Sequence, residues 1–178
     1  MRQNMTTFFI VIIFIIKFHA FSEINFFASD GNAIYKLMYN GQTLKKIIDL
    51  NDVRDIVYDP AGLIYAYHGT FDPVLRILDT AGTSIDSIKH QEWSTANNGS
   101  YGGIGFLDPF VFVSDMNTAG DSDTGNGVIR FKLVDKSVLR FATDIEPIDL
   151  TIGKDKLLYV LSPGGSPGGR VVSIFDPI

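Results

Sequence analysis

The sequence predicts an all-β protein built from repeated antiparallel four-stranded units, and three observations lead to that prediction. Short runs of apolar, β-branched and aromatic residues recur at close spacing between turns rich in Gly, Asn, Asp and Pro. No stretch of about 12 residues keeps a helical period with caps, so few helices are expected. The third observation is a repeated pattern of strand, polar loop, strand and Asp turn, which is clearest at residues 62–82, GLIYAYHGTFDPVLRILDTAG.

The amino terminus has the features of a secretory signal. Arg2 precedes the unbroken apolar run FFIVIIFII at residues 8–16, and Ala20-Phe21-Ser22 offers small residues for cleavage after Ser22. The alternative is an uncleaved membrane anchor, but this run is far shorter than the roughly 20 residues that span a bilayer. We therefore expect residues 1–22 to be a signal peptide and residues 23–178 to form one repeat domain that is secreted or periplasmic.

Composition narrows the classes of partner. Without Arg2 and Lys17 of the signal, the chain keeps 13 basic and 20 acidic residues, a net charge of −7. An acidic chain lacks the basic footprint that nucleic acids require, so we expect no nucleic-acid partner. The chain has no cysteine, so packing rather than disulfides must hold the fold together.

The strands follow from apolar runs between turn signals. Fourteen are expected, at residues 24–28, 33–39, 43–49, 55–59, 63–67, 74–79, 84–89, 103–107, 110–114, 128–134, 137–142, 148–152, 157–161 and 170–175.

These segments repeat in a fixed order. Residues 53–62, 101–109 and 147–156 each contain an Asp turn and lead at once into an apolar strand, LIYAY, FVFVS or LLYVL. After a variable loop comes a third strand, VLRILD, RFKLVD or VVSIFD, with IYKLMY in the first copy. Apolar and polar side chains alternate in these third strands, so we expect one half-buried face carrying the pairs Tyr35/Leu37, Leu75/Ile77, Phe131/Leu133 and Val172/Ile174.

Four short antiparallel strands every 40 to 50 residues or so are typical of β-propeller blades, whose strands we letter a to d from the axis outward. The segments DPAGLIYAYHGTFDPVLRILDTAG and GKDKLLYVLSPGGSPGGRVVSIFD resemble blades of the NHL and lactonase-like propellers, and the resemblance extends over roughly residues 24–178. The strands make about three and a half blades, fewer than the four to eight of an ordinary ring. We therefore expect an incomplete β-propeller-like array, either a fragment of a longer propeller or a chain that self-associates through its open blade edges. A β-sandwich or barrel is the alternative fold.

The resemblance also implies a chemistry to look for. Lactonase-type propellers hold a divalent metal on the axis with Glu, Asn and Asp side chains from several inner strands, which polarises a carbonyl. In this sequence the corresponding segments offer Asp55, Glu146 and Asp149, but no clear Glu–Asn–Asn–Asp set.

A blade array places its b–c and d–a connections on one face, and loops on a rigid scaffold are where binding groups usually lie. We interpret this face as a binding surface for a protein or a glycan. The candidate binding residues are His68, Asp72, His90, Glu92 and Trp93. The alternative for each of them is an ordinary loop or packing residue.

One loop on this face has a composition suited to calcium. Residues 115–127, DMNTAGDSDTGNG, place carboxylate and amide oxygens at short spacing with glycines between them, although they do not match the EF-hand pattern. A solvated polar loop is the alternative. The candidate Ca²⁺ ligands are Asp115, Asn117, Asp121 and Asp123.

The sequence therefore predicts an exported, propeller-like module that binds a protein or glycan and carries no catalytic motif. A metal-dependent enzyme of the lactonase or lyase type and a truncated, non-functional propeller remain the alternatives. Asn98-Gly99-Ser100 would accept an N-linked glycan in a eukaryotic source.

Overall fold

The computed structural model describes residues 26–37, 44–69, 74–89, 102–115, 126–164 and 168–178. Over these ranges the regular secondary structure consists of β-strands, and no helix there is long and apolar enough to cross a membrane. The strands are β1 (Phe26–Ser29), β2 (Ala33–Leu37), β3 (Leu44–Asp49), β4 (Val53–Tyr58), β5 (Ile64–His68), β6 (Val74–Leu78), β7 (Ser84–Ile88), β8 (Ile104–Leu107), β9 (Phe110–Asp115), β10 (Gly127–Lys132), β11 (Val138–Phe141), β12 (Asp149–Ile152), β13 (Leu158–Pro163) and β14 (Arg170–Phe175).

The strands form four separate antiparallel sheets, each made of strands that are consecutive in sequence. We call them blade 1 (β1–β3), blade 2 (β4–β7), blade 3 (β8–β11) and blade 4 (β12–β14). Blades 2 and 3 have four strands in the order of the chain, whereas blades 1 and 4 have three. The all-β prediction and the incomplete array of four-stranded blades are confirmed.

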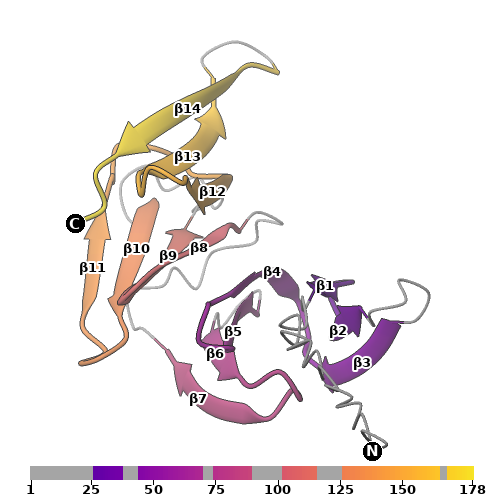
Figure 1. The fold of residues 1–178 in the computed structure, drawn as a ribbon. Coiled ribbons are helices and arrows are strands. Elements are labelled where there is room, and N and C mark those ends of the chain that lie inside the picture. The colour runs from indigo at the N-terminus through magenta and orange to yellow at the C-terminus, as the bar shows by residue number, and fades with distance from the viewer. Residues whose placement is uncertain (1–25, 38–43, 70–73, 90–101, 116–125, 165–167) are drawn as a thin grey trace, which may run out of the picture.

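The blades stand side by side in an arc (Figure 1). Their innermost strands contact one another in the order β1, β4, β8, β12. The described strands leave this arc open between blade 4 and blade 1, which lie at its two ends. The first and last blades therefore each have one sheet face that no other described blade covers.

Aspartates at the starts of hairpin turns explain why the strands end where they do. The Asp59 carboxylate accepts hydrogen bonds from the backbone N–H of Leu63 at 2.8 Å and from the Tyr65 hydroxyl at 3.0 Å. In blade 4 the turn starts at Gly153, and Asp155 within it accepts similar hydrogen bonds from the backbone N–H of Leu157 at 3.1 Å and from the Tyr159 hydroxyl at 2.6 Å. Such side-chain bonds satisfy turn donors locally, and so each turn is encoded within a few residues.

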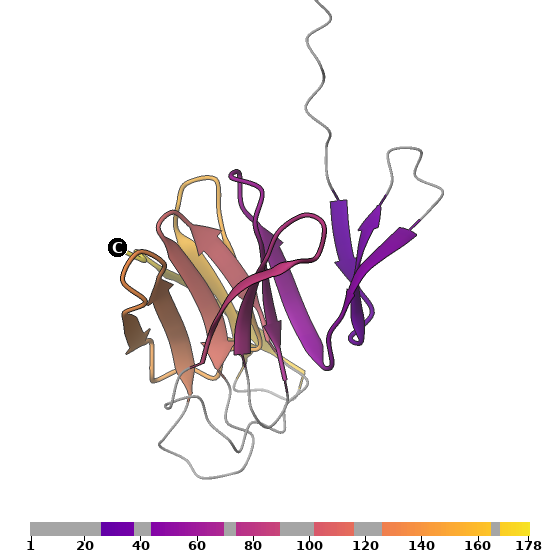
Figure 2. The same ribbon diagram turned by 90° about the horizontal axis from the view of Figure 1, so that it is seen from below.

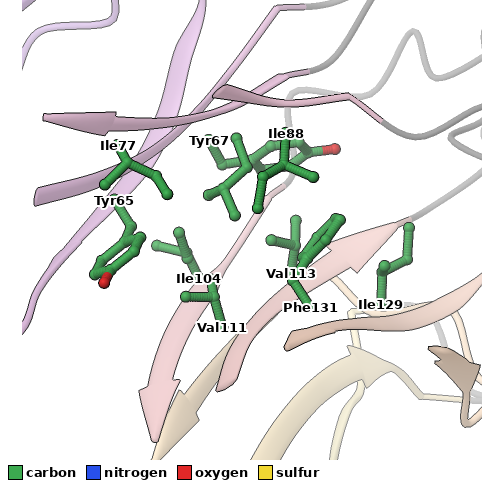
Figure 3. Packing of buried hydrophobic residues seen from close by; sticks show 10 residues of the cluster. Tyr65, Tyr67, Ile77, Ile88, Ile104, Val111, Val113, Ile129 and Phe131 are labelled. Atoms are coloured by element: carbon green, nitrogen blue, oxygen red, sulfur yellow. The ribbon is translucent and has the colours of Figure 1, made fainter. Parts of the chain in front are cut away.

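The core lies between the blades rather than in one central mass. Tyr65, Tyr67 and Ile77 of blade 2 face Ile104 and Val111 of blade 3 in a largely apolar layer (Figure 3). Similar layers join blade 1 to blade 2 and blade 3 to blade 4. Face-to-face packing of half-apolar sheets is thus what holds the arc together.

The alternation predicted for the third strand of each blade has two outcomes. In β6 the predicted face is buried, since Leu75 is 0% and Ile77 is 9% exposed. In β14 the expectation of burial is wrong, because Val172 and Ile174 are each 57% exposed. The physical reason is that β14 belongs to the last blade, whose corresponding face has no described neighbour.

Candidate functional site

The longer connections leave the blades on one side, which we call the loop face. The strands alternate in direction, so the β5–β6, β9–β10 and β13–β14 connections emerge together with β3–β4, β7–β8 and β11–β12. Backbone hydrogen bonds tie neighbouring points of this face together, from Val53 N–H to the Gly31 carbonyl at 2.8 Å and from Gly69 N–H to the Asp52 carbonyl at 3.0 Å. In Figure 2 the strand ends of this face lie toward the lower side of the molecule.

Asp115, the last residue of β9, lies at the base of the loop face. Its side chain is fully buried, and its Oδ2 pairs with Nη2 of Arg140 on β11 at 2.7 Å. A second nitrogen of Arg140 donates to the Asn126 carbonyl at 3.5 Å, at the point where the chain re-enters blade 3. The ion pair therefore joins both ends of the 116–125 connection. The other predicted calcium ligands, Asn117, Asp121 and Asp123, lie outside the described residues, so the calcium site stays a prediction.

Tyr67 lies beside this ion pair, at the junction of blades 2 and 3. Burial raises the pKa of the Tyr67 phenol, and the nearby Asp115 carboxylate raises it further. The Arg54 guanidinium lies over the ring, 5.5 Å from its centroid. The phenol is therefore neutral at physiological pH, and the base of the loop face combines two guanidiniums, one carboxylate and one aromatic ring.

His68 ends β5 on the same face and is half-buried. Its Nε2 accepts a hydrogen bond from Nε of Arg76 at 3.3 Å. Burial and the Arg76 charge lower the pKa of His68, so the imidazole is neutral at pH 7. The remaining predicted binding residues, Asp72, His90, Glu92 and Trp93, lie outside the described residues.

The inner strands bring two aspartates close to the axis. Asp55 Oδ2 accepts a hydrogen bond from the backbone N–H of Ile104 in the next blade at 3.0 Å, and Oδ1 accepts from Ile56 N–H at 2.8 Å. Burial raises the pKa of Asp55, and the charge of Asp149 raises it further. Asp149 Oδ1 accepts a hydrogen bond from the backbone N–H of the next residue, Leu150, at 2.8 Å.

These inner-strand contacts are chiefly structural. A glycine at position 103 is needed between the aspartates, because a Cβ there would collide with Asp149 Oδ1 and the Leu150 nitrogen. The contact of Asp55 with Ile104 was missed by sequence reasoning. One signal could have found it. In blades 2 and 4 an aspartate precedes the inner-strand residue, Ile56 or Leu150, and its carboxylate accepts from that residue's N–H. In blade 3 the preceding residue is Gly103, so the Ile104 N–H needs an acceptor from another blade.

The ligand set implied by a lactonase-type resemblance is not assembled in the part of the chain that the structure describes. No group of three His, Asp or Glu side chains comes together there. Both oxygens of Asp55 already accept backbone hydrogen bonds, and Glu146 is exposed in the β11–β12 connection. The described residues thus do not fit a divalent metal on the axis.

Four sheets packed face to face around a line of inner strands define a β-propeller-like fold. Two solved propeller enzymes are similar in structure: a gluconolactonase from Xanthomonas campestris, with a TM-score of 0.57 and 17% identity, and a luciferin-regenerating enzyme, with a TM-score of 0.51 and 15% identity. Each match covers 82% of this chain but only 52% and 54% of those proteins, so the chain spans about half their length. No protein-family model matches the chain, and no curated protein matches it in sequence.

Proposed function

We propose that this protein is an exported binding module that holds a protein or glycan ligand on its loop face. The observation that carries the proposal is the difference between the two sides of the arc. On the opposite side, the 59–63, 79–83 and 133–137 connections are short turns closed by hydrogen bonds to aspartate carboxylates or between backbone groups. On the loop face, the 89–103 and 116–126 connections are long, and the Asp115–Arg140 pair fixes the strand ends from which the 116–126 connection leaves.

The chemistry at the base of the loop face supports this role. Arg54 is partly exposed there and its guanidinium lies over the fully buried ring of Tyr67; arginine is over-represented at recognition surfaces because its guanidinium buries area and still offers directional contacts. The side chains that the sequence puts forward for ligand contact are Asp72, between β5 and β6 in the chain, and His90, Glu92 and Trp93, between β7 and β8.

The single tryptophan gives a direct test. Trp93 lies in the β7–β8 connection and is the only indole in the chain, so its fluorescence reports on this face without a label. We expect a panel of neutral and acidic oligosaccharides, and peptides of mixed sequence, to include ligands that shift the Trp93 emission saturably. Trp93→Ala is expected to weaken the same binding when it is followed by calorimetry, whereas Val134→Ala in a turn of the opposite side is expected to leave it unchanged. An affinity that is unchanged in Trp93→Ala but reduced in Val134→Ala would refute the proposal.

A second candidate is a metal-dependent lactonase-type activity, since a gluconolactonase is among the similar structures. The observation in its favour is that Asp55 on β4 and Asp149 on β12, with β8 between the two strands, lie near enough for the charge of Asp149 to raise the pKa of Asp55. Calorimetric titration with Ca²⁺, Mg²⁺ and Zn²⁺ tests it. A site lost in Asp149→Asn would favour the enzyme, and the absence of any heat or melting-temperature change with all three ions would exclude its metal-dependent form.

A further inference from the structure

Blade 4 has a sheet face that repeats, position for position, a face that is buried in blade 2. In blade 2 the cross-strand rows are Asp55–Tyr67–Leu75 and Val57–Tyr65–Ile77. In blade 4 the equivalent rows are Asp149–Leu161–Val172 and Thr151–Tyr159–Ile174. Residues directly opposite on antiparallel strands share a face, so each blade presents one aspartate and a set of apolar side chains on this side.

The two faces differ in what covers them. Tyr67 and Leu75 of blade 2 are 0% exposed beneath blade 3, whereas Val172 and Ile174 of blade 4 are 57% exposed. A hollow of about 260 Å³ opens on this side of blade 4. It is lined by Asp149, Leu150, Thr151, Tyr159, Leu161 and Val172. A contiguous apolar sheet face of this kind is the usual mark of an interaction surface.

Blade 1 carries the complementary free face at the other end of the arc. Its row Phe26–Leu37–Leu44 runs across the three strands, and Phe26 and Leu44 are 58% and 54% exposed. The opposite side of the same sheet, with Phe27 and Ile34, packs on blade 2. At each internal junction, the side of one blade that is turned toward the following blade packs on the side of that blade that is turned back toward the preceding one. Among the described residues, the arc thus has one uncovered sheet face at each end.

We propose that the free face of blade 4 binds the free face of blade 1 of a second copy of this chain, head to tail. The contact places the free face of blade 4, whose counterpart in blade 2 is covered by blade 3, against the Phe26–Leu37–Leu44 row of blade 1. The length of the arc fits this partner, since the aligned part spans about half of each similar propeller and two arcs supply about one ring. A head-to-tail contact made twice closes two copies into a ring.

Sedimentation velocity on the full chain, over a concentration series, tests the proposal with two charge substitutions and a matched control. Val172→Asp alters the blade 4 face and Phe26→Asp the blade 1 face. Val134→Asp places the same charge on a turn residue that is 80% exposed and lies on neither face. All three positions are solvent-exposed, so circular dichroism is expected to show an unchanged fold. We expect a dimer for the unaltered chain and for Val134→Asp. We expect each of the other two variants to raise the dissociation constant about tenfold or more, because an ionised carboxylate would have to be buried.

Mixing the two interface variants separates head-to-tail association from every alternative. The Val172→Asp chain keeps its blade 1 face and the Phe26→Asp chain keeps its blade 4 face, so the mixture should associate although neither variant does so alone. Open assemblies longer than a dimer that both variants abolish also support the contact. A monomer at all concentrations, a dimer that survives Phe26→Asp, association that survives both variants, or a mixture that stays monomeric would each overturn it.

Discussion

The carboxylate of Asp55 in blade 2 accepts a hydrogen bond from the backbone N–H of Ile104 in blade 3, at 3.0 Å. This bond joins two sheets that share no strand, at the point where their inner strands meet. Ile104 needs it because Gly103, which precedes it, has no side chain that could cap the N–H group. Blade 2 therefore provides the acceptor, Asp55, for a backbone donor of blade 3, and this bond helps to align the two blades.

Replacing Asp55 tests that role. Asp55→Ala should lower the free energy of unfolding by about 1–3 kcal/mol, because it leaves the Ile104 N–H without its acceptor at a part-buried position. Asp55→Asn keeps an accepting oxygen and should cost less. Since burial raises the pKa of Asp55 above 3.8, ionisation of this carboxyl destabilises the fold as pH rises through that pKa. Urea denaturation between pH 4 and neutrality should show this component in the unaltered chain and not in Asp55→Asn. Equal losses in both variants would contradict the hydrogen-bond explanation.

The glycine before Ile104 should be intolerant of any side chain. A Cβ at Gly103 would overlap the Leu150 backbone nitrogen and Asp149 Oδ1, so Gly103→Ala must push blades 3 and 4 apart. We expect a loss of about 1–3 kcal/mol in thermal or urea denaturation. Gly105→Ala is the matched control, because a Cβ there meets the side chains of Leu150 and Ile152 at 3.1 and 3.2 Å, which can shift, and the Ile152 nitrogen at 3.7 Å, an ordinary van der Waals distance. A larger loss for Gly105→Ala would show that the close approach lies elsewhere.

The ion pair at the base of the loop face should be important for stability. Arg140→Met removes the guanidinium from a fully buried Asp115 carboxylate, and breaking a buried pair in this way typically costs about 3–5 kcal/mol. The double variant Asp115→Asn with Arg140→Met should recover part of the loss, since the buried negative charge is then gone. Denaturation midpoints of Arg140→Met, Asp115→Asn, the double variant and the unaltered chain decide the matter. A double variant less stable than the sum of its single changes would argue against a pairwise interaction.

Stability should also fall in mildly acidic solution because of His68. Its pKa in the folded state lies below the ordinary value of about 6.5, so the unfolded chain binds a proton more readily. The contribution is complete above about pH 6.5 and declines as pH falls toward the lower folded pKa, by at most about 1.4 kcal/mol per unit. His68→Gln keeps an acceptor for Arg76 and should flatten this part of the profile. An unchanged profile in that variant would assign the effect to another group.

The strand pattern could be predicted from sequence because it is locally encoded. All fourteen expected strands are present, and their ends shift by only a residue or two, as where β4 begins at Val53 rather than Asp55. The Asp turns, such as Asp59 with Leu63 and Tyr65, are contained within one hairpin. Contacts between sheets could not be predicted in this way, since the pairing of Asp55 with Ile104 depends on how two independent sheets come into register. The exposure of Val172 has the same origin, because it depends on the number of neighbouring blades.

The candidate site could be predicted less completely than the fold. Sequence reasoning placed His68 and Asp115 among the loop-face residues, but not their partners Arg76 and Arg140, which lie on neighbouring strands of the same sheets. Polar residues in strands give no signal of whether they point to solvent or to a buried acid. The calcium ligands and the binding role of Trp93 stay predictions.

Each sheet consists of strands that are consecutive in the chain, and this order has a consequence for biosynthesis. Within each described sheet, every strand pairs with a strand next to it in the sequence, so β4 to β7 can pair as soon as residue 88 has emerged from the ribosome. Hairpins with such local contacts form quickly compared with non-local sheets. The blades can therefore assemble vectorially, one after another, with each completed sheet acting as the template on which the next one settles.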